Sequence, residues 1–214
     1  MISGAVVRNA VILGLFALGA SGLLALTHQA TQERVTCNRQ AALSTALAQV
    51  MPAQRHDNRL REDAIRVSDP RLGPGEKTLY RARLNGEARG VVVEATAPDG
   101  YGGAIDLLIG VARDGRVLGV RVVPPHHETP GLGDAIERRK SDWIESFQGH
   151  SLRQPDTDGW AVHKDGGVFD AFSGATITPR AVIKAVHRAL LYLRDQDGTL
   201  FTRPAQVALD SACD

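Results

Sequence analysis

The first strong pattern along the chain is an uninterrupted apolar run near its start. Residues 10–27 read AVILGLFALGASGLLALT, and no charged residue stands between Arg8 and Glu33. A run of about 18 residues is near the lower limit for a membrane-spanning helix, and the uncharged flanks extend it. We therefore expect a transmembrane anchor over residues 10–29, preceded by a short cytoplasmic N-terminus over residues 1–9.

The orientation of this anchor follows from the charges beside it. Arg8 and the amino terminus lie on the short side, which the positive-inside rule places in the cytoplasm, although Arg34 and Arg39 follow soon after the run. The rest of the chain would then lie on the periplasmic side of the inner membrane, held by a single-pass anchor. A cleaved signal peptide is the alternative, but the absence of a convincing small-x-small site after the run favours an uncleaved anchor.

A long stretch without a continuous apolar pattern follows. We interpret residues 30–75 as a linker that begins with a weakly amphipathic helix over residues 32–50 and continues as a charged, exposed stretch. Two prolines and two glycines in residues 70–75 indicate a loop. The folded domain is expected over residues 76–200, and residues 201–214 as a loosely ordered C-terminal tail.

The first half of this domain is rich in strand patterns. Alternating or continuous apolar positions predict strands over residues 78–84, 87–96, 104–112 and 117–123. Asn85-Gly86 and the stretch 113–116 are hairpin signals, while residues 98–103 are typical of a loop. Consecutive hairpins favour an antiparallel sheet over a βαβ unit. The predicted fold class is therefore α+β, an antiparallel sheet with flanking helices.

Helical spacing returns in the second half. Residues 134–147 predict a helix in which Trp143 belongs to the core, and residues 160–162 a short strand. A second helix is predicted from an apolar stripe, formed by Val182, Ile183, Val186, Leu190 and Leu193. Thr178 has the residue type of an N-cap and Pro179 suits the first helical position. This helix is therefore expected to begin at Pro179.

Composition and charge exclude several classes of function. The 214 residues carry a formal net charge of +1 and only 5% aromatic side chains, which does not indicate a nucleic-acid partner. No Gly-x-Gly-x-x-Gly follows a strand, so a dinucleotide-binding unit is unsupported. The histidines have no serine or cysteine that spacing would single out, so hydrolase chemistry is unsupported too. Cys37 and Cys213 have no zinc-site spacing, and the sequence leaves open whether they form a disulfide.

Two polar segments are candidates for binding. Gly174, Ala175 and Thr176 stand just before the second helix, where free amides and the helix dipole favour an anion such as a phosphate, and small side chains permit close approach. A plain capping turn is the alternative. The other segment, residues 124–133, is a proline-held polar loop after a strand, a common position for a binding site. A metal site at its adjacent histidines is disfavoured, because neighbouring histidines rarely point at one ion.

Both segments resemble signatures of one family. The run Ser173-Gly174-Ala175-Thr176-x-Thr178, with Asp170 before it and Pro179 after it, resembles the flavinylation motif of FMN-binding domains. Glu128-Thr129-Pro130-Gly131-Leu132-Gly133 matches a second signature of that family, in a loop near the flavin. The family includes the G subunit of the Rnf electron-transport complex and the C subunit of the sodium-pumping NADH:quinone reductase. The compact chain is more similar to the first of these two subunits.

The resemblance implies roles for these residues. In the family the last threonine of the first motif carries FMN through a phosphoester, and the matching residue is Thr176. Ser173, Gly174, Ala175 and Thr178 would shape the turn and offer hydrogen bonds to the phosphate. Glu128, Thr129, Gly131 and Leu132 would contact the flavin. A separate flavin transferase that uses FAD and magnesium makes the attachment in the family, so such a transferase is an expected partner.

The function that the resemblance implies is redox work. The chain would be a flavoprotein subunit of a multisubunit, ion-translocating membrane complex, relaying electrons between ferredoxin and NADH through its covalent FMN, with the other subunits as partners. The alternatives are a C-type subunit of a sodium-pumping NADH:quinone reductase and a membrane-anchored, non-catalytic binding or scaffold module. A secreted binding protein would require the first thirty or so residues to be a removed signal.

Overall fold

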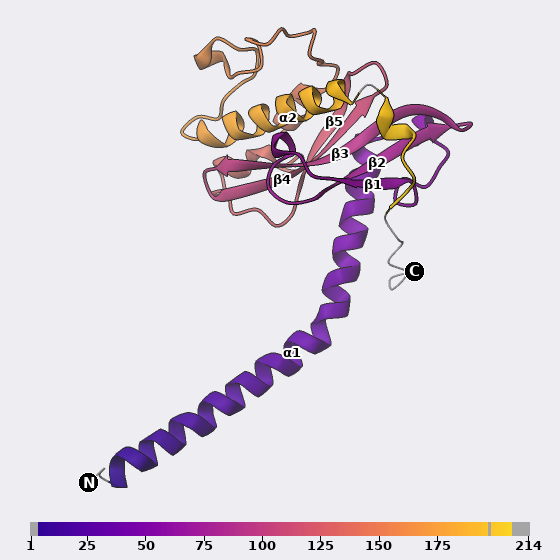
Figure 1. The fold of residues 1–214 in the computed structure, drawn as a ribbon. Helices are drawn as coiled ribbons and strands as arrows, with labels where there is room; N and C mark the ends of the chain where they lie inside the picture. The colour runs from indigo at the N-terminus through magenta and orange to yellow at the C-terminus, as the bar shows by residue number, and fades with distance from the viewer. Residues whose placement is uncertain (1–3, 197, 207–214) are drawn as a thin grey trace. The chain divides into compact units, whose positions relative to one another are not determined.

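The computed structural model describes residues 4–196 and 198–206 (Figure 1). Contacts divide the chain into two compact units, and within the described residues the boundary falls between Ala42 and Leu43. The expected N-terminus over residues 1–9 and the expected tail over residues 201–214 lie partly outside the described residues.

The first unit consists of the N-terminal part of helix α1 (Gly4–Val50). Its residues Gly4–Gln32 are apolar and long enough to cross a membrane, and none of them is buried in the structure. This stretch includes residues 10–29, over which the sequence predicts the anchor. The helix expected over residues 32–50 is the continuation of the same helix. Cys37, further along α1, is disulfide-bonded, and Cys213 lies outside the described residues.

The second unit is built on a five-stranded antiparallel sheet. Its strands are β1 (Ala64–Val67), β2 (Lys77–Leu84), β3 (Glu87–Gly100), β4 (Gly103–Ala112) and β5 (Val117–Val123), arranged in the order β1-β2-β3-β4-β5. The predicted α+β class is therefore confirmed. The compact unit begins earlier than the boundary at residue 76, because β1 and the end of α1 belong to it. Strand β1 has only four residues, too few to give a strand pattern, and pairing with β2 defines it.

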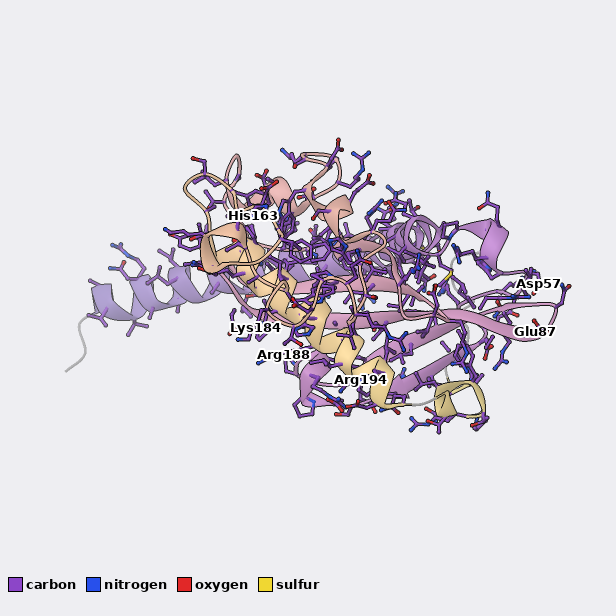
Figure 2. All side chains as sticks on the ribbon, turned by 90° about the horizontal axis from the view of Figure 1, so that it is seen from above. Asp57, Glu87, His163, Lys184, Arg188 and Arg194 are labelled. Atoms are coloured by element: carbon purple, nitrogen blue, oxygen red, sulfur yellow. The ribbon has the colours of Figure 1, made fainter. Side chains whose placement is uncertain are left out.

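The hairpins form where turn chemistry predicted them, with one exception. Asn85 and Gly86 have φ values of 54° and 78°, as a two-residue hairpin turn requires. The Asn85 amide donates to Asp57 at 2.7 Å, and Figure 2 shows Asp57 and Glu87 together at this end of the sheet. The loop predicted over residues 98–103 is wrong, because β3 and β4 continue to a tight turn there. The register shifts just after Ala97, and such an irregularity accommodates Pro98, which has no amide to donate.

The two faces of the sheet are covered by different helices. Figure 1 shows helix α2 (Ile177–Asp195) packed over one face of the sheet. Val91 and Val93 belong to the same apolar cluster as the buried side of this helix. Val92 points to the opposite face, where it meets Val50 in the last turn of α1. Alternation along β3 thus separates two apolar clusters, one on each face. The polar side of α2 carries Lys184, Arg188 and Arg194, which follow one another along the helix (Figure 2).

The segment between β5 and α2 is less regular than its sequence suggested. The single helix predicted over residues 134–147 is wrong, because two short 3-10 helices form instead, Gly133–Ile136 and Trp143–Phe147. The charged stretch between them has no apolar residue to bury, so packing fixes two separate turns rather than one amphipathic helix. The strand predicted over residues 160–162 is reduced to one bridge, between Val162 and Phe169.

The described end of the chain is tied to the sheet. Arg81, which is buried, donates to the carbonyl of Leu200 at 3.0 Å, and Arg83 donates to the carbonyl of Phe201 at 2.7 Å. The Gln206 amide donates to the carbonyl of Ala64 at 2.9 Å. Residues 201–206 therefore differ from the loosely ordered tail expected from the sequence. The attachment depends on arginines more than a hundred residues earlier, which no local pattern reveals.

A pair of glycines makes room for the end of α1, and this generates a stability prediction. Gly110 and Gly119 face each other across β4 and β5. A Cβ on Gly110 would lie 2.0 Å from the carbonyl oxygen of Val50, whereas a Cβ on Gly119 would meet only ordinary contacts from 3.4 Å. Gly110→Ala should lower the free energy of unfolding by about 1–3 kcal/mol through overpacking. Gly119→Ala, the matched control, should change it by less than about 1 kcal/mol.

Denaturant unfolding of the full chain in detergent, followed by tryptophan fluorescence, measures both values. Equal stability of the two variants would show that the last turn of α1 does not press on the sheet at Gly110.

Candidate functional site

Three segments meet around one buried carboxyl group. They are the β3–β4 turn, the loop after β5, and the turn that leads into α2. Glu128, in the loop, is only 5% exposed. Its Oε1 accepts a hydrogen bond from the Gly102 amide at 2.9 Å, and its Oε2 accepts one from the Thr178 hydroxyl. The structure thus brings together the two motifs that the sequence singled out.

Glycines allow the backbone to approach this carboxyl group closely. A Cβ on Gly133 would lie 2.4 Å from Oε2 of Glu128 and 3.1 Å from the Thr178 hydroxyl. A Cβ on Gly100 would lie 2.9 Å from Oε1 of the same side chain, and one on Gly102 would lie 1.9 Å from the carbonyl oxygen of His127. Any larger residue at these positions would push the three segments apart.

The loop after β5 is folded into a tight turn by its own backbone. The carbonyl oxygen of Thr129 accepts from the amides of Leu132 and Asp134, at 3.1 and 3.3 Å. The Gly131 amide donates to Oδ1 of Asp134 at 2.7 Å, and Gly131 has a φ of 77°, which favours glycine. The turn points the Leu132 side chain toward the flavinylation motif, where Leu132 Cδ2 would lie 3.6 Å from a Cβ on Gly174.

The turn before α2 is held from beneath by an aromatic residue. Trp143 donates its ring N–H to the carbonyl of Asp170 at 2.8 Å, and its ring centroid lies 5.0 Å from that of Phe172. Trp143 is buried, so its predicted place in the core is confirmed. The carbonyl of Phe172 accepts from the Ala175 amide at 3.1 Å and closes the turn. Gly174, with a φ of 77°, is exposed at its tip.

Helix α2 begins two residues earlier than predicted. The predicted N-cap at Thr178 is wrong, because Thr176 occupies that position and Thr178 lies inside the first turn. Thr178 is fully buried, and its hydroxyl donates a hydrogen bond to Glu128 instead of capping the helix. Pro179 remains compatible with the first turn, where its missing amide has no intrahelical partner.

Thr176 therefore combines an N-cap position with an uncommitted side chain. Its hydroxyl makes no capping hydrogen bond, and the residue is half-buried. The amides of Ile177 and Thr178 belong to the first turn and have no intrahelical acceptor. These amides and the helix dipole create a positive potential beside the Thr176 hydroxyl, which suits a phosphate group.

Exposed apolar side chains occur on each of the three segments that Glu128 joins. Within the described residues after Ala42, the large apolar side chains that are exposed are Tyr101, Leu132, Val168 and Ile177. Tyr101 is in the β3–β4 turn, Leu132 in the loop after β5, and Ile177 follows Thr176 directly. Three of the four therefore come from the segments joined by Glu128, and they offer apolar contacts to a flat aromatic ligand.

Ion pairs flank the site on two sides. Nε2 of His126 and Oε1 of Glu137 lie 2.7 Å apart. A hydrogen bond from Arg139, supported by His126, holds the pKa of Glu137 below its usual value. Arg180, in the first turns of α2, forms two hydrogen bonds with Asp165, at 2.6 and 2.7 Å, and these lower the pKa of Asp165. These pairs anchor the neighbouring loops, and neither of them involves the Thr176 hydroxyl.

Comparison with known proteins shows which family the chain belongs to. Residues 100–191 match the FMN-binding domain, and residues 1–50 match the RnfG N-terminal region. The G subunit of the ion-translocating oxidoreductase complex of Pseudomonas aeruginosa (strain UCBPP-PA14) is 51% identical over 187 residues, covering 86% of this chain and 87% of that protein. The chain belongs to this family of G subunits. The corresponding proteins of Escherichia coli (strain K12) and Vibrio atlanticus (strain LGP32) are 47% and 44% identical, covering 96% and 94% of this chain and 96% of each relative.

The matched FMN-binding domain contains all three segments of the site. It begins at Gly100, the last residue of β3, and ends in α2. Membership of the family thus agrees with both sequence motifs. The sequence did not reveal the bond between Glu128 and Thr178, which joins residues 50 positions apart, or the support from Trp143. The glycines at positions 100, 102 and 133 indicate that the backbone is closely approached there, but the sequence does not show which residues approach it.

The packing around Glu128 generates a second prediction. Gly133→Ala should lower the free energy of unfolding by about 1–3 kcal/mol, because the new methyl group would overlap Oε2 of Glu128. Gly119→Ala, at a buried glycine with ordinary contacts, is the control. Denaturant unfolding of the full chain tests the pair, and an unchanged midpoint for Gly133→Ala would contradict the packing described here.

Proposed function

We propose that the chain is the FMN-carrying subunit of a membrane-bound, ion-translocating oxidoreductase complex, with FMN joined to the hydroxyl of Thr176 through a phosphoester. The observation that carries the proposal is the position of this hydroxyl. It stands at the start of α2, makes no capping bond, and lies within a matched FMN-binding domain. The names of the three relatives favour a G-type subunit over the C-type subunit of a sodium pump.

The residues present fit a phosphate and a flavin ring. The first-turn amides of α2 would donate hydrogen bonds to the phosphate, and the small residues Ser173, Gly174 and Ala175 would let it approach the turn closely. Tyr101, Leu132 and Ile177 supply exposed apolar surface for the ring. Thr129 and Gly131 shape the loop that carries Leu132. FMN supplies the electron chemistry when bound, and the protein binds and orients it.

Attachment requires a transfer reaction. A flavin transferase with magnesium would direct the Thr176 hydroxyl to the FMN-side phosphorus of FAD. The bond between Oγ1 and phosphorus forms, the phosphoanhydride bond breaks, AMP leaves, and the hydroxyl proton passes to the medium. No electron is transferred in this step.

The anchor supports a location for this chemistry. The apolar Gly4–Gln32 stretch would hold the chain in the inner membrane, with the FMN-binding domain on the periplasmic side. A covalent link prevents loss of the flavin where it could not easily be replaced. The chain would relay electrons between other subunits of the complex, in transfer between ferredoxin and NADH.

The proposed acceptor can be tested directly. The full chain and a Thr176→Ala variant are co-expressed with a flavin transferase, exported, denatured and examined by in-gel fluorescence and intact mass. The wild type should be fluorescent and heavier by one FMN, and Thr176→Ala should be dark, because it lacks the acceptor oxygen. Thr157→Ala, at an exposed threonine outside the site, should be labelled like the wild type.

Other outcomes have equally direct meanings. A labelled Thr176→Ala variant would move the attachment to another residue. A dark wild type, with the transferase active on a control substrate, would reject covalent attachment and leave the non-catalytic scaffold as the better hypothesis.

A further inference from the structure

We propose that Glu128 is a positioning residue for flavin attachment, which acts through Thr178 and Gly102 rather than by touching the flavin. This inference rests on the proposed function. It assigns Glu128 and the Thr178 hydroxyl a role that differs from the direct flavin and phosphate contacts that their motifs suggested. The two residues form a clamp, defined here as the Glu128 carboxyl group with its two donors, the Gly102 amide and the Thr178 hydroxyl.

The clamp joins three segments that are distant from one another in the sequence. Glu128 lies 26 residues after Gly102 and 50 residues before Thr178. One oxygen of its carboxyl group binds the β3–β4 turn, and the other binds the first turn of α2. The sheet fixes the position of the β3–β4 turn. Because Glu128 binds both this turn and α2, the carboxyl group also fixes the start of the helix relative to the sheet.

Burial makes the clamp a strong constraint. Glu128 is 5% exposed and Thr178 is fully buried, so water cannot readily replace either partner. Removing the Thr178 hydroxyl would leave Oε2 of Glu128 without a partner in a closed site, which is more costly than the loss of an exposed hydrogen bond. Gly133 closes the site from the other side, because even a methyl group there would overlap Oε2.

The same geometry keeps Glu128 away from a ligand. Both of its oxygens already accept hydrogen bonds from the protein, and its side chain is enclosed by Gly100 and Gly133. A flavin at the exposed tip of the acceptor turn would meet Leu132 and Ile177 instead. Glu128 therefore influences attachment only through the segments that it holds.

The acceptor is coupled to the clamp from both sides. Thr176 lies two residues before Thr178, at the N-cap of the helix whose first turn the clamp holds. Leu132 lies four residues after Glu128 and reaches toward Gly174, two residues before the acceptor. The clamp thus fixes both the helix start and the loop that packs against the turn. Transfer reactions are sensitive to such placement, since a displacement of about 1 Å can reduce a rate about a hundredfold.

Matched substitutions separate positioning from simple stability. Thr178→Val keeps the shape of the side chain and removes the donor, and Thr178→Ser keeps the donor. Thr96→Val is the control, because Thr96 is also 5% exposed and donates its hydroxyl to a carboxylate, Asp106, at 2.5 Å on the sheet. This control removes a hydroxyl-to-carboxylate bond outside the flavin-attachment site, where the Asp106 side chain is exposed and Thr96 also accepts a hydrogen bond from Lys77 at 2.5 Å.

The measurement is the rate of attachment, with folding measured on the same samples. Full-length, flavin-free chains in detergent are incubated with the transferase, FAD and magnesium, and the fluorescent product is followed at a temperature well below the unfolding midpoints. Thr178→Val should lower kcat for attachment by about tenfold to a hundredfold, with a smaller change in KM. Thr178→Ser should restore most of the rate, and Thr96→Val should react like the wild type.

A double variant keeps the test decisive if Thr178→Val folds poorly. Glu128→Leu combined with Thr178→Val replaces both side-chain partners of the buried bond by apolar groups, which restores stability in many buried pairs, and it leaves the half-buried Gly102 amide without its acceptor. The clamp predicts that this variant folds and is still attached slowly. Attachment at the wild-type rate in either folded variant would overturn the positioning role. A dark wild type would instead reject the proposed function, and the unfolding data would still report what the clamp does for stability.

Discussion

A buried carboxyl group dictates the arrangement of the site. Glu128 is buried, so its carboxylate oxygens need hydrogen-bond donors from the protein rather than from water. One donor is the Gly102 amide in the β3–β4 turn, and the other is the Thr178 hydroxyl in α2. Satisfying both donors at once is compatible with only a narrow range of positions for the three segments. The glycines around the carboxyl group and the tight turn at Gly131 are consequences of that requirement.

The sheet is the rigid reference for this arrangement. Antiparallel strands β3 and β4 form the longest hairpin, and their turn delivers the Gly102 amide to Glu128. Helix α2 lies across the same sheet, held by the apolar cluster that includes Val91 and Val93. The body of the helix is thus fixed by burial and its first turn by a hydrogen bond. The start of the helix is therefore held in a defined position, while the Thr176 side chain stays accessible.

Accessibility and rigidity are both needed for the proposed function. A transferase must reach the Thr176 hydroxyl, and that residue is half-buried with no capping bond of its own. A bound flavin must afterwards be held in one orientation, and the exposed apolar side chains beside Thr176 offer it contacts. The apolar stretch Gly4–Gln32 would in addition hold the FMN-binding domain at a membrane.

The sequence by itself determined the features that depend on local composition. Apolar length indicated a helix long enough to cross a membrane, alternation and turn residues located most of the strands, and two short motifs indicated two of the segments that Glu128 joins. The tertiary structure alone decided the features that depend on distant partners. It divided the predicted helix over residues 134–147, added β1, moved the start of α2 to Ile177 and joined Glu128 to Thr178. The physical reason is that a buried polar group takes whichever partner the folded chain brings to it, and that partner can lie 50 residues away.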